Sequence, residues 1–334
     1  YRIIDFDLSN MSNSGISNVG IVAKSNFQSL MDHVGSGSAY DLSKRRSNLS
    51  ILPPYDGKAF SSFVETIYNM HGYIEHCREE YVLISQGNVI TNIDYTDVFD
   101  FHSKKKADIT LIYKNHAIPQ GYDRPITLDV DNDGKVNQIF VKPGVVDKGV
   151  FNHAYGSILI KKDLLMSEIR NAISVNQLDV RRLIQSSLGK YSIYAYENKG
   201  YCAAISSIND YFEFNMDLMK KEVRDELFNP QRPIYTKVRD DAPSRYGLTS
   251  NVKNSIIAQG CVINGDVENC VISKGVYVGE GAKLSNCIVM QDTKIGCNTN
   301  LNYVIIDKDV TIKDGRSLMG YDSYPIYIAK KSVV

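Results

Sequence analysis

The stretch Asn254-Ser-Ile-Ile257 returns three times toward the end of this chain, as Asn269-Cys-Val-Ile272, Asn286-Cys-Ile-Val289 and Asn302-Tyr-Val-Ile305. The copies follow one another at intervals of 15, 17 and 16 residues, with six-residue units such as Val276-Tyr-Val-Gly-Glu-Gly281 between them. Three six-residue faces make one coil of a parallel β-helix, in which aliphatic side chains stack inward from every coil. The repeat therefore predicts a left-handed parallel β-helix over residues 251–334, with the strands of a β-sandwich as the alternative.

Before residue 228 the pattern is different, because strand-like and helix-like segments alternate. Apolar side chains recur at helical spacing in residues 27–34 and 60–74, and strand-like runs lie at 19–23, 49–52, 81–85 and 108–113. The runs at 49–52 and 81–85 have the composition of fully buried strands. The turn Asp131-Asn-Asp-Gly134 joins two further runs and predicts a hairpin. We expect a Rossmann-like α/β domain with a mixed, mostly parallel sheet, whose ligands bind outside the carboxyl ends of the strands.

Residues 229–250 separate these two patterns and contain Pro230, Pro233 and Pro243 among charged residues. Proline and charge at this density are typical of a linker. The sequence thus predicts an α/β domain over residues 1–228, a linker over 229–250 and the β-helix over 251–334.

The composition excludes several classes of protein. The formal net charge is zero, which does not favour binding to nucleic acid or to an anionic membrane surface. No stretch approaches the roughly 20 apolar residues that a membrane-spanning helix needs, and no signal-peptide pattern is present. None of the six cysteines forms a C-x-x-C pair, so they are expected to be buried thiols rather than metal ligands or disulfides. We expect a cytoplasmic protein, in keeping with free thiols.

The strand-like run Tyr81-Val-Leu-Ile-Ser85 is followed by Gln86-Gly87-Asn88. An apolar strand followed by a glycine turn and a carboxylate is how sugar nucleotidyltransferases hold magnesium against a nucleoside triphosphate. Position 88 carries an amide instead, and a neutral side chain cannot hold a hard dication as a carboxylate does. The motif indicates an enzyme fold without the charge that its chemistry requires.

The segment Tyr1-Arg-Ile-Ile-Asp-Phe-Asp-Leu-Ser-Asn10, followed by Asn13-Ser-Gly-Ile16, closely resembles bacterial ADP-glucose pyrophosphorylases (glucose-1-phosphate adenylyltransferases). Further matching motifs are His33-Val-Gly-Ser-Gly37, Ile51-Leu-Pro-Pro54, Asp94-Tyr95, Lys142-Pro143, Gly200-Tyr201 and Asn215-Met-Asp-Leu218. With the β-helical tail, the resemblance covers essentially the whole chain. It implies a nucleotidyltransferase domain that makes ADP-glucose from ATP and glucose 1-phosphate, and a β-helix that helps to assemble tetramers and to form effector sites.

The departures from this family concern the metal site first. The resemblance implies that Asn88 and Ala204, the latter in Gly200-Tyr-Cys-Ala-Ala204, stand where two carboxylates jointly hold magnesium in active members. Losing a single preorganised charge-stabilising group commonly costs about 10²–10³ in rate, and the metal is central to this type of transfer. We therefore expect no catalytic residue and no metal cofactor in this chain, and little or no activity when it is alone.

Other departures surround the substrate. The resemblance implies a Gly-rich, Arg-containing triphosphate loop upstream of Tyr1, which this sequence does not include. It places Phe63 where a small nucleotide-facing residue is usual, Val141 in place of a glutamate, and Asp179-Val-Arg181 in place of Asp-Phe-Gly. The sugar-phosphate lysine is retained as Lys142, although a surface lysine at a strand end is the competing interpretation.

Two further residues have alternative roles. Asp94 is either a substitute metal ligand or the cap of the following helix, and the cap is favoured. Arg2 stands where the resemblance implies an anion-facing arginine near a regulatory effector site. Ser17-Asn18 replace a basic pair there, which weakens the prediction of effector binding.

These observations lead to one hypothesis and two alternatives. The chain is predicted to be a non-catalytic or impaired regulatory subunit in glycogen biosynthesis, paired with a catalytic ADP-glucose pyrophosphorylase subunit in a hetero-oligomer, as a tetramer, and able to bind a sugar phosphate or nucleotide. The alternatives are a slow but genuine adenylyltransferase that uses Asp94, and a structural assembly protein without ligand. An acyltransferase of the hexapeptide class is not favoured, because no histidine follows His153.

Overall fold

The computed structural model describes residues 1–23, 27–43, 48–52, 62–118, 125–141, 149–238 and 240–334. The chain forms two compact units, residues 1–204 with 227–237 and residues 205–226 with 238–334. These units differ from the predicted boundaries, because helix α8 (Ile208–Asp217) belongs with the β-helix and not with the α/β domain. No helix in the described part of the chain is long and apolar enough to cross a membrane.

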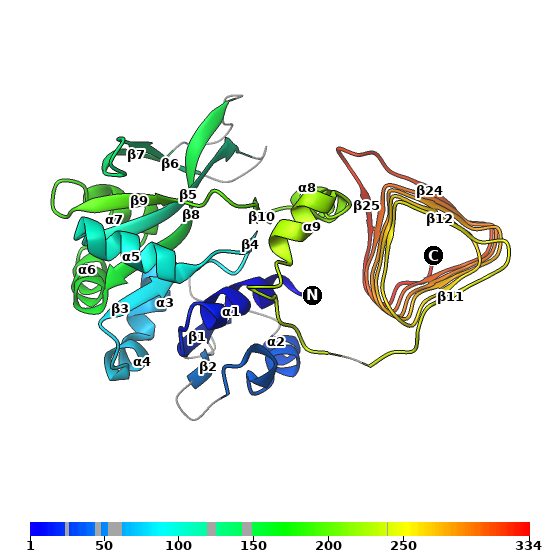
Figure 1. The fold of residues 1–334 in the computed structure, drawn as a ribbon, viewed down its shortest axis with the longest axis horizontal. Coiled ribbons are helices and arrows are strands. Elements are labelled where there is room, and N and C mark those ends of the chain that lie inside the picture. The colour runs from blue at the N-terminus through cyan, green and yellow to red at the C-terminus, as the bar shows by residue number, and fades with distance from the viewer. Residues whose placement is uncertain (24–26, 44–47, 53–61, 119–124, 142–148, 239) are drawn as a thin grey trace. The chain divides into compact units, whose positions relative to one another are not determined.

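The first unit is built on a six-stranded mixed sheet (Figure 1), with the order β7-β6-β8-β5-β9 and β3 also paired to β8. Its strands are β3 (Tyr81–Ile84), β5 (Ile109–Ala117), β6 (Ile126–Val130), β7 (Val136–Val141), β8 (Val150–Lys161) and β9 (Ile193–Glu197). Strands β3, β5 and β6 each run antiparallel to β8, and β9 runs parallel to β5. Four strands therefore point the same way, which confirms the mixed α/β prediction.

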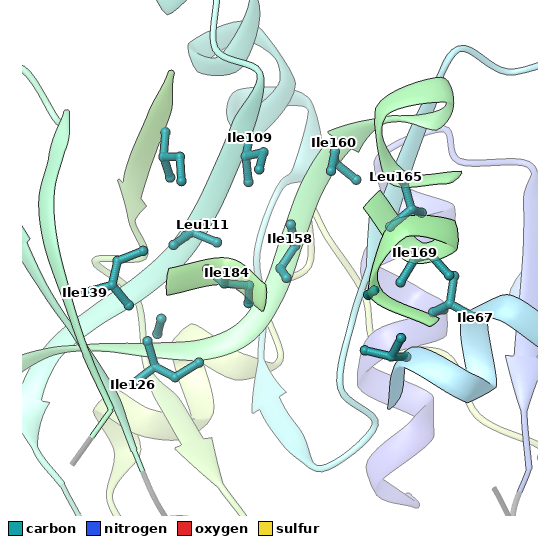
Figure 2. Close-up of a cluster of buried hydrophobic side chains, with 14 of the residues drawn as sticks. Ile67, Ile109, Leu111, Ile126, Ile139, Ile158, Ile160, Leu165, Ile169 and Ile184 are labelled. Atoms are coloured by element: carbon teal, nitrogen blue, oxygen red, sulfur yellow. The ribbon is translucent and has the colours of Figure 1, made fainter. Parts of the chain in front are cut away.

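The helices of the first unit pack partly on this sheet and partly, in a separate cluster, on a smaller strand pair. They are α1 (Ile3–Asn13), α2 (Phe27–Val34), the 3-10 helix η1 (Ser38–Tyr40), α3 (Phe63–Asn69), α4 (His71–His76), α5 (Tyr95–Lys105), α6 (Lys162–Ser174) and α7 (Val180–Ser186). Figure 2 shows the main cluster, in which Ile109 of β5 and Ile158 of β8 belong to the same buried group as Ile169 of α6. The predicted helix 27–34 is confirmed, and the predicted hairpin at Asp131–Gly134 joins β6 to β7.

Two small sheets complete the first unit. Strands β1 (Asn18–Val22) and β2 (Asn48–Leu52) pair in parallel, and β4 (Val89–Thr91) pairs antiparallel with β10 (Cys202–Ala204). The runs in β2 and β3 were predicted to be fully buried, and this is wrong, since β3 and most of β2 are only half-buried. Among the described residues each of these strands has a partner on one side only, so part of its surface remains open.

The second unit contains a left-handed β-helix made of three five-stranded parallel sheets, seen end-on as a triangle of stacked coils (Figure 1). Its strands are β11 (Arg245–Tyr246), β12 (Asn251–Lys253), β13 (Ile256–Ile257), β14 (Val262–Ile263), β15 (Asp266–Glu268), β16 (Val271–Ile272), β17 (Tyr277–Val278), β18 (Lys283–Ser285), β19 (Ile288–Val289), β20 (Lys294–Ile295), β21 (Asn300–Asn302), β22 (Val304–Ile306), β23 (Thr311–Ile312), β24 (Ser317–Met319) and β25 (Ile326–Ile328). Strand β11 pairs with β14, so the first coil begins inside the predicted linker 229–250.

The repeated asparagines occupy one corner of the coils. Asn254, Asn269 and Asn286 have φ values of 39°, 51° and 51°, in the left-handed region that asparagine tolerates better than most residues. The Asn254 amide donates to Asn269 Oδ1 at 2.6 Å, which links adjacent coils. In the fourth copy Tyr303 takes the left-handed position (φ 52°), while Asn302 lies one residue earlier and accepts a hydrogen bond from Asn286.

The sheet formed by β13, β16, β19, β22 and β25 is apolar on its outer side as well as its inner side. The outward Ile288 and Ile305 are each 1% exposed because they form a cluster with Phe212 of α8. Helix α8 is therefore part of this unit, and the short helix α9 (Lys221–Leu227) follows it.

Candidate functional site

The structure brings the two predicted metal-ligand positions together. In the β4–β10 pair Ala204 lies opposite Val89, and Asn88 immediately precedes Val89. The turn Gln86-Gly87-Asn88 begins two residues after β3 ends, at the carboxyl end where a ligand was expected. Sequence positions separated by more than a hundred residues thus lie close together in one strand pair.

The side chains at this site do not suit a divalent cation. Asn88 is half-buried and carries an amide, and Ala204 is 4% exposed and carries only a methyl group. Magnesium requires oxygen ligands in near-octahedral geometry, usually with at least one carboxylate from the protein. Across the described residues no group of three or more histidine, cysteine, aspartate or glutamate side chains has the arrangement of a metal site. The donor set here therefore does not fit a magnesium ion.

A buried acid that sequence reasoning missed lies beside this site. Asp7 of α1 is 6% exposed, and its Oδ1 accepts a hydrogen bond from Ser85 Oγ at 2.8 Å. Burial raises the pKa of Asp7 to about 7, against the opposing effect of the Ser85 hydrogen bond. No local sequence signal marked it, because the burial of the helical positions Asp5–Asn10 becomes visible only in the folded chain.

A buried polar cluster on β5 and β8 forms another wall of the site. The Tyr155 hydroxyl lies 2.9 Å from His116 Nε2, and His153 Nδ1 lies 3.3 Å from the same nitrogen. Burial, together with the neighbouring His116, lowers the pKa of His153 to about 3. Burial also raises the pKa of the Cys202 thiol to about 12, although a hydrogen bond from Tyr155 opposes this. At neutral pH His153 is therefore not a cation, and Cys202 is a thiol rather than the reactive thiolate.

Backbone contacts hold β10 in place beside β4. Lys114 Nζ donates to the carbonyl oxygens of Lys199 at 2.6 Å and Gly200 at 2.5 Å. Thr91 Oγ1 donates to the carbonyl of Tyr201 at 2.8 Å, and it accepts from the Asn198 amide at 2.8 Å. These bonds fix the segment that carries Ala204 although β10 is short.

Asp94 is the N-cap of α5. Its Oδ1 accepts a hydrogen bond from the Thr96 backbone N–H at 2.9 Å and from Ser14 Oγ at 3.4 Å, and its Oδ2 lies 3.9 Å from Arg232 Nη1. Partial burial works against the charged form, but the Thr96 hydrogen bonds and the Arg232 charge outweigh it and lower the pKa of Asp94. The arrangement supports the capping role and offers no second carboxylate for a metal ion.

The remaining predicted residues are distributed away from this site or outside the described part. Arg2 Nη1 donates to the Ser29 carbonyl at 2.8 Å and to Ser29 Oγ at 3.2 Å, which ties α1 to α2. Phe63 is the first residue of α3 and packs against the main core. Val141 ends β7, and Lys142 lies outside the described residues, as does Pro143. Asp179 caps α7 through the Arg181 backbone N–H.

The sequence also did not predict the contacts that three polar side chains make with the Asp5 carboxylate. The Asp5 side chain is fully buried and accepts hydrogen bonds from Tyr40 Oη and Thr236 Oγ1 at 2.6 and 2.7 Å. His33 Nε2 lies 2.6 Å from the same carboxylate. The start of the chain thus serves as an internal scaffold for α1 and the segments packed on it.

Comparisons with known proteins agree with this architecture. The nucleotidyl transferase family model matches residues 1–221, and the model for the GlmU-like C-terminal hexapeptide region matches residues 237–324. The chain is 33% identical over 334 residues to the glycogen biosynthesis protein GlgD of Bacillus subtilis (strain 168), covering 99% of this chain and 87% of that protein.

The chain is similar to glucose-1-phosphate adenylyltransferases to about the same extent. Identity to the glucose-1-phosphate adenylyltransferase of Clostridium perfringens (strain 13 / Type A) is 32% over 352 residues, covering 100% of this chain and 88% of that enzyme. The corresponding enzyme of Clostridium acetobutylicum is 32% identical over 289 residues, covering 84% of this chain and 75% of the enzyme. The family resemblance seen in the sequence is confirmed. The chain belongs to the nucleotidyl transferase family, within the group that contains the glucose-1-phosphate adenylyltransferases and GlgD.

Proposed function

We propose that this chain is a catalytically impaired regulatory subunit of a glucose-1-phosphate adenylyltransferase that acts in glycogen biosynthesis. The observation that supports the proposal is the β4–β10 pair, in which Ala204 lies opposite Val89, the residue after Asn88. The family resemblance assigns magnesium-binding carboxylates to positions 88 and 204. An amide and a methyl group supply no negative charge to that ion.

The expected loss of rate follows from how this reaction is catalysed. Nucleotidyl transfer depends mainly on positioning and on metal ions that offset the charge of the phosphates. Removal of one preorganised charge-stabilising group commonly lowers kcat by about 10²–10³, and loss of both metal ligands lowers it further without simple additivity. Asp94 does not compensate, because its carboxylate caps α5.

A regulatory role is supported by what the chain retains. The mixed sheet belongs to a region that matches the nucleotidyl transferase model, and the β-helix to a region that matches the hexapeptide model. A partner that carries such a fold can favour one conformation of a catalytic subunit, provided that it binds the two conformations with different affinity. We propose a hetero-oligomer with a catalytic glucose-1-phosphate adenylyltransferase, as a tetramer, without a bound metal in this chain.

The test compares ADP-glucose formation by three samples at equal total protein. The purified chain alone should produce no ADP-glucose above a no-enzyme control, and a catalytic homologue from the same cell supplies the reference rate. The mixture should change kcat or the apparent affinity of the catalytic subunit, and a heat-denatured sample of this chain should not. Turnover by the chain alone at a rate near the catalytic homologue would contradict the proposal, as would a mixture that behaves as the sum of its parts.

Retention of a sugar phosphate in the impaired site is a separate part of the proposal. It rests on Lys142, which the family resemblance assigns to the sugar phosphate. Isothermal titration with glucose 1-phosphate should give heat of binding that Lys142→Ala removes and Lys104→Ala, a matched change in the exposed last turn of α5, leaves intact. Binding that is equal in both variants would exclude this role for Lys142.

A further inference from the structure

We propose that the side chain of Tyr155 closes the space at which a divalent cation would sit, so that the site excludes the ion by packing as well as by its missing carboxylates. This inference rests on the proposed function and names the residue that enforces it. Restoring the two acids alone would then not restore a metal site.

The packing around position 204 is the first observation. Tyr155 is 2% exposed and forms one buried apolar cluster with Val89 and Ala204, to which Cys202 adds a further contact. The methyl group of Ala204 faces these neighbours and not water, since only 4% of the residue is exposed. A carboxylate at this position would therefore lose its hydration without gaining a partner of opposite charge.

The Tyr155 ring is held in place from the other side. Its hydroxyl lies 2.9 Å from His116 Nε2, and its ring centroid lies 4.9 Å from that of His153 and 5.5 Å from that of His116. His116 and His153 are themselves stacked, with centroids 5.5 Å apart and an angle of 20° between the rings. These contacts come from two paired strands of the central sheet, so the ring has little freedom to move aside.

The turn that carries position 88 is seated against β8, the strand that carries Tyr155. Gly156, the residue after Tyr155, has φ of +80°, and a Cβ atom added there would lie 2.1 Å from Gln86 Nε2. The side chain of Gln86 therefore rests directly over the Gly156 backbone, which fixes the turn Gln86-Gly87-Asn88 against β8. The Tyr155 side chain thus packs against Ala204 and against Val89, the residue that follows position 88.

The test uses Mn²⁺ as the probe and electron paramagnetic resonance of free Mn²⁺ as the readout, on the full chain without nucleotide. The variants are Asn88→Asp/Ala204→Asp and the same pair with Tyr155→Val. We expect the double variant to bind Mn²⁺ no better than the parent, and the triple variant to bind at least about tenfold more tightly than the double. Equal affinity of the double and triple variants, whether tight or absent, would overturn the assignment of Tyr155.

Two controls separate ring volume from other effects. The triple variant with Tyr155→Phe keeps the ring and removes only the hydroxyl, so it should bind Mn²⁺ like the double variant. The triple variant with Ile169→Ala opens the main core on α6, where Ile169 is 1% exposed, without opening space at position 204. It should also bind like the double variant, and tight binding by either control would overturn the role of the Tyr155 ring.

A measurement on the single variant Ala204→Asp covers the case in which the triple variants do not fold. If Tyr155 encloses position 204, this carboxylate is desolvated, and the variant should lose several degrees of Tm relative to the parent at pH 8 but much less at pH 5. An equal loss of Tm at both pH values would show that the charge of the carboxylate is not desolvated there, and it would overturn the inference. The parent is titrated with Mn²⁺ in parallel, because binding by the parent would contradict the proposed function itself, whereas binding by the double variant contradicts only the role of Tyr155.

Discussion

The β-helix and the candidate site use buried positions in opposite ways. Inside the β-helix the inward positions of successive coils carry aliphatic side chains, such as Ile272, Val289 and Ile306, each at most 1% exposed. At the candidate site the buried positions carry Asp7 and His153, whose charged forms burial disfavours. The first arrangement maximises apolar burial, and the second keeps desolvated polar groups near the candidate site.

This difference indicates that the β-helix is built for stability, whereas the buried polar groups of the candidate site serve another role. Apolar stacking between coils requires no specific chemistry, so its pattern repeats along the sequence. Buried polar groups are costly unless satisfied, and in proteins they often mark sites of binding or catalysis. Substitutions in the two regions should therefore differ in sign and in pH dependence.

The largest expected effect is that of Asp7→Asn at alkaline pH. The folded pKa of Asp7 is about 7 and its ordinary value is 3.8, so the folded state binds the extra proton between these values. The contribution of Asp7 to the free energy of unfolding should be greatest below about pH 4. It should be lost as the pH rises through about 7, which lowers the stability of the parent by up to about 4 kcal/mol. Asp7→Asn removes this dependence, so urea unfolding at pH 8 should show the variant to be more stable. A variant less stable than the parent at pH 8 would contradict the description of Asp7 as an acid that burial destabilises in its charged form.

A substitution in the β-helix should be destabilising at every pH. Ile272 lies inward between Ile257 and Val289 of the adjacent coils. Ile272→Ala removes buried volume and should lower the free energy of unfolding by about 3 kcal/mol. Lys283→Ala on an outward position of β18 is the matched control and should change it by less than about 0.5 kcal/mol. Similar losses for both would mean that inward stacking is not the dominant contribution.

The hydroxyl of Tyr155 should contribute less than the packing of its ring. Tyr155→Phe removes the hydrogen bond with His116 and should lower the free energy of unfolding by about 1 kcal/mol. Thermal unfolding monitored by circular dichroism is sufficient to detect it. A loss as large as that of Ile272→Ala would show that the polar network stabilises the first unit as strongly as apolar stacking stabilises the second.

The smallest effect is expected at the helix cap. Asp94→Ala removes the N-cap of α5 and should cost about 1 kcal/mol or less, since the carboxylate is only partly buried. The effect of the chain on a catalytic partner should be unchanged, as measured by ADP-glucose formation in the mixture. A selective loss of that effect at normal stability would restore Asp94 as a functional residue.

The periodic parts of the fold could be predicted from the sequence because their signals are local. Helix α2 has the predicted bounds, and the β-helix register follows the first two repeat spacings of 15 and 17 residues. The third step differs, because Ile305 pairs with Ile288, 17 residues earlier, so Tyr303 and not Asn302 takes the corner position. The first coil was missed because β11 is two residues long and lies in a proline-rich segment. Only the pairing with β14 reveals it.

The candidate site could be predicted in part. Asn88 and Ala204 were identified by resemblance, and their proximity depends on a three-residue pairing across a large sequence separation. The burial of Asp7 and the Tyr155–His116–His153 network have no local signature, because they arise from side chains that meet only in the folded sheet. Sequence patterns therefore located the two weakened positions but not the side chains that fill the space around them.

Crystals of the parent chain soaked with Mn²⁺ and ATP test the central claim most directly. Anomalous scattering at a wavelength near the manganese absorption edge locates the ion independently of the nucleotide density. The account predicts no manganese peak coordinated by Asn88 or adjoining Ala204, with Tyr155 in its place in the buried cluster. A well-occupied peak at that position, with Tyr155 displaced or still present, would contradict it.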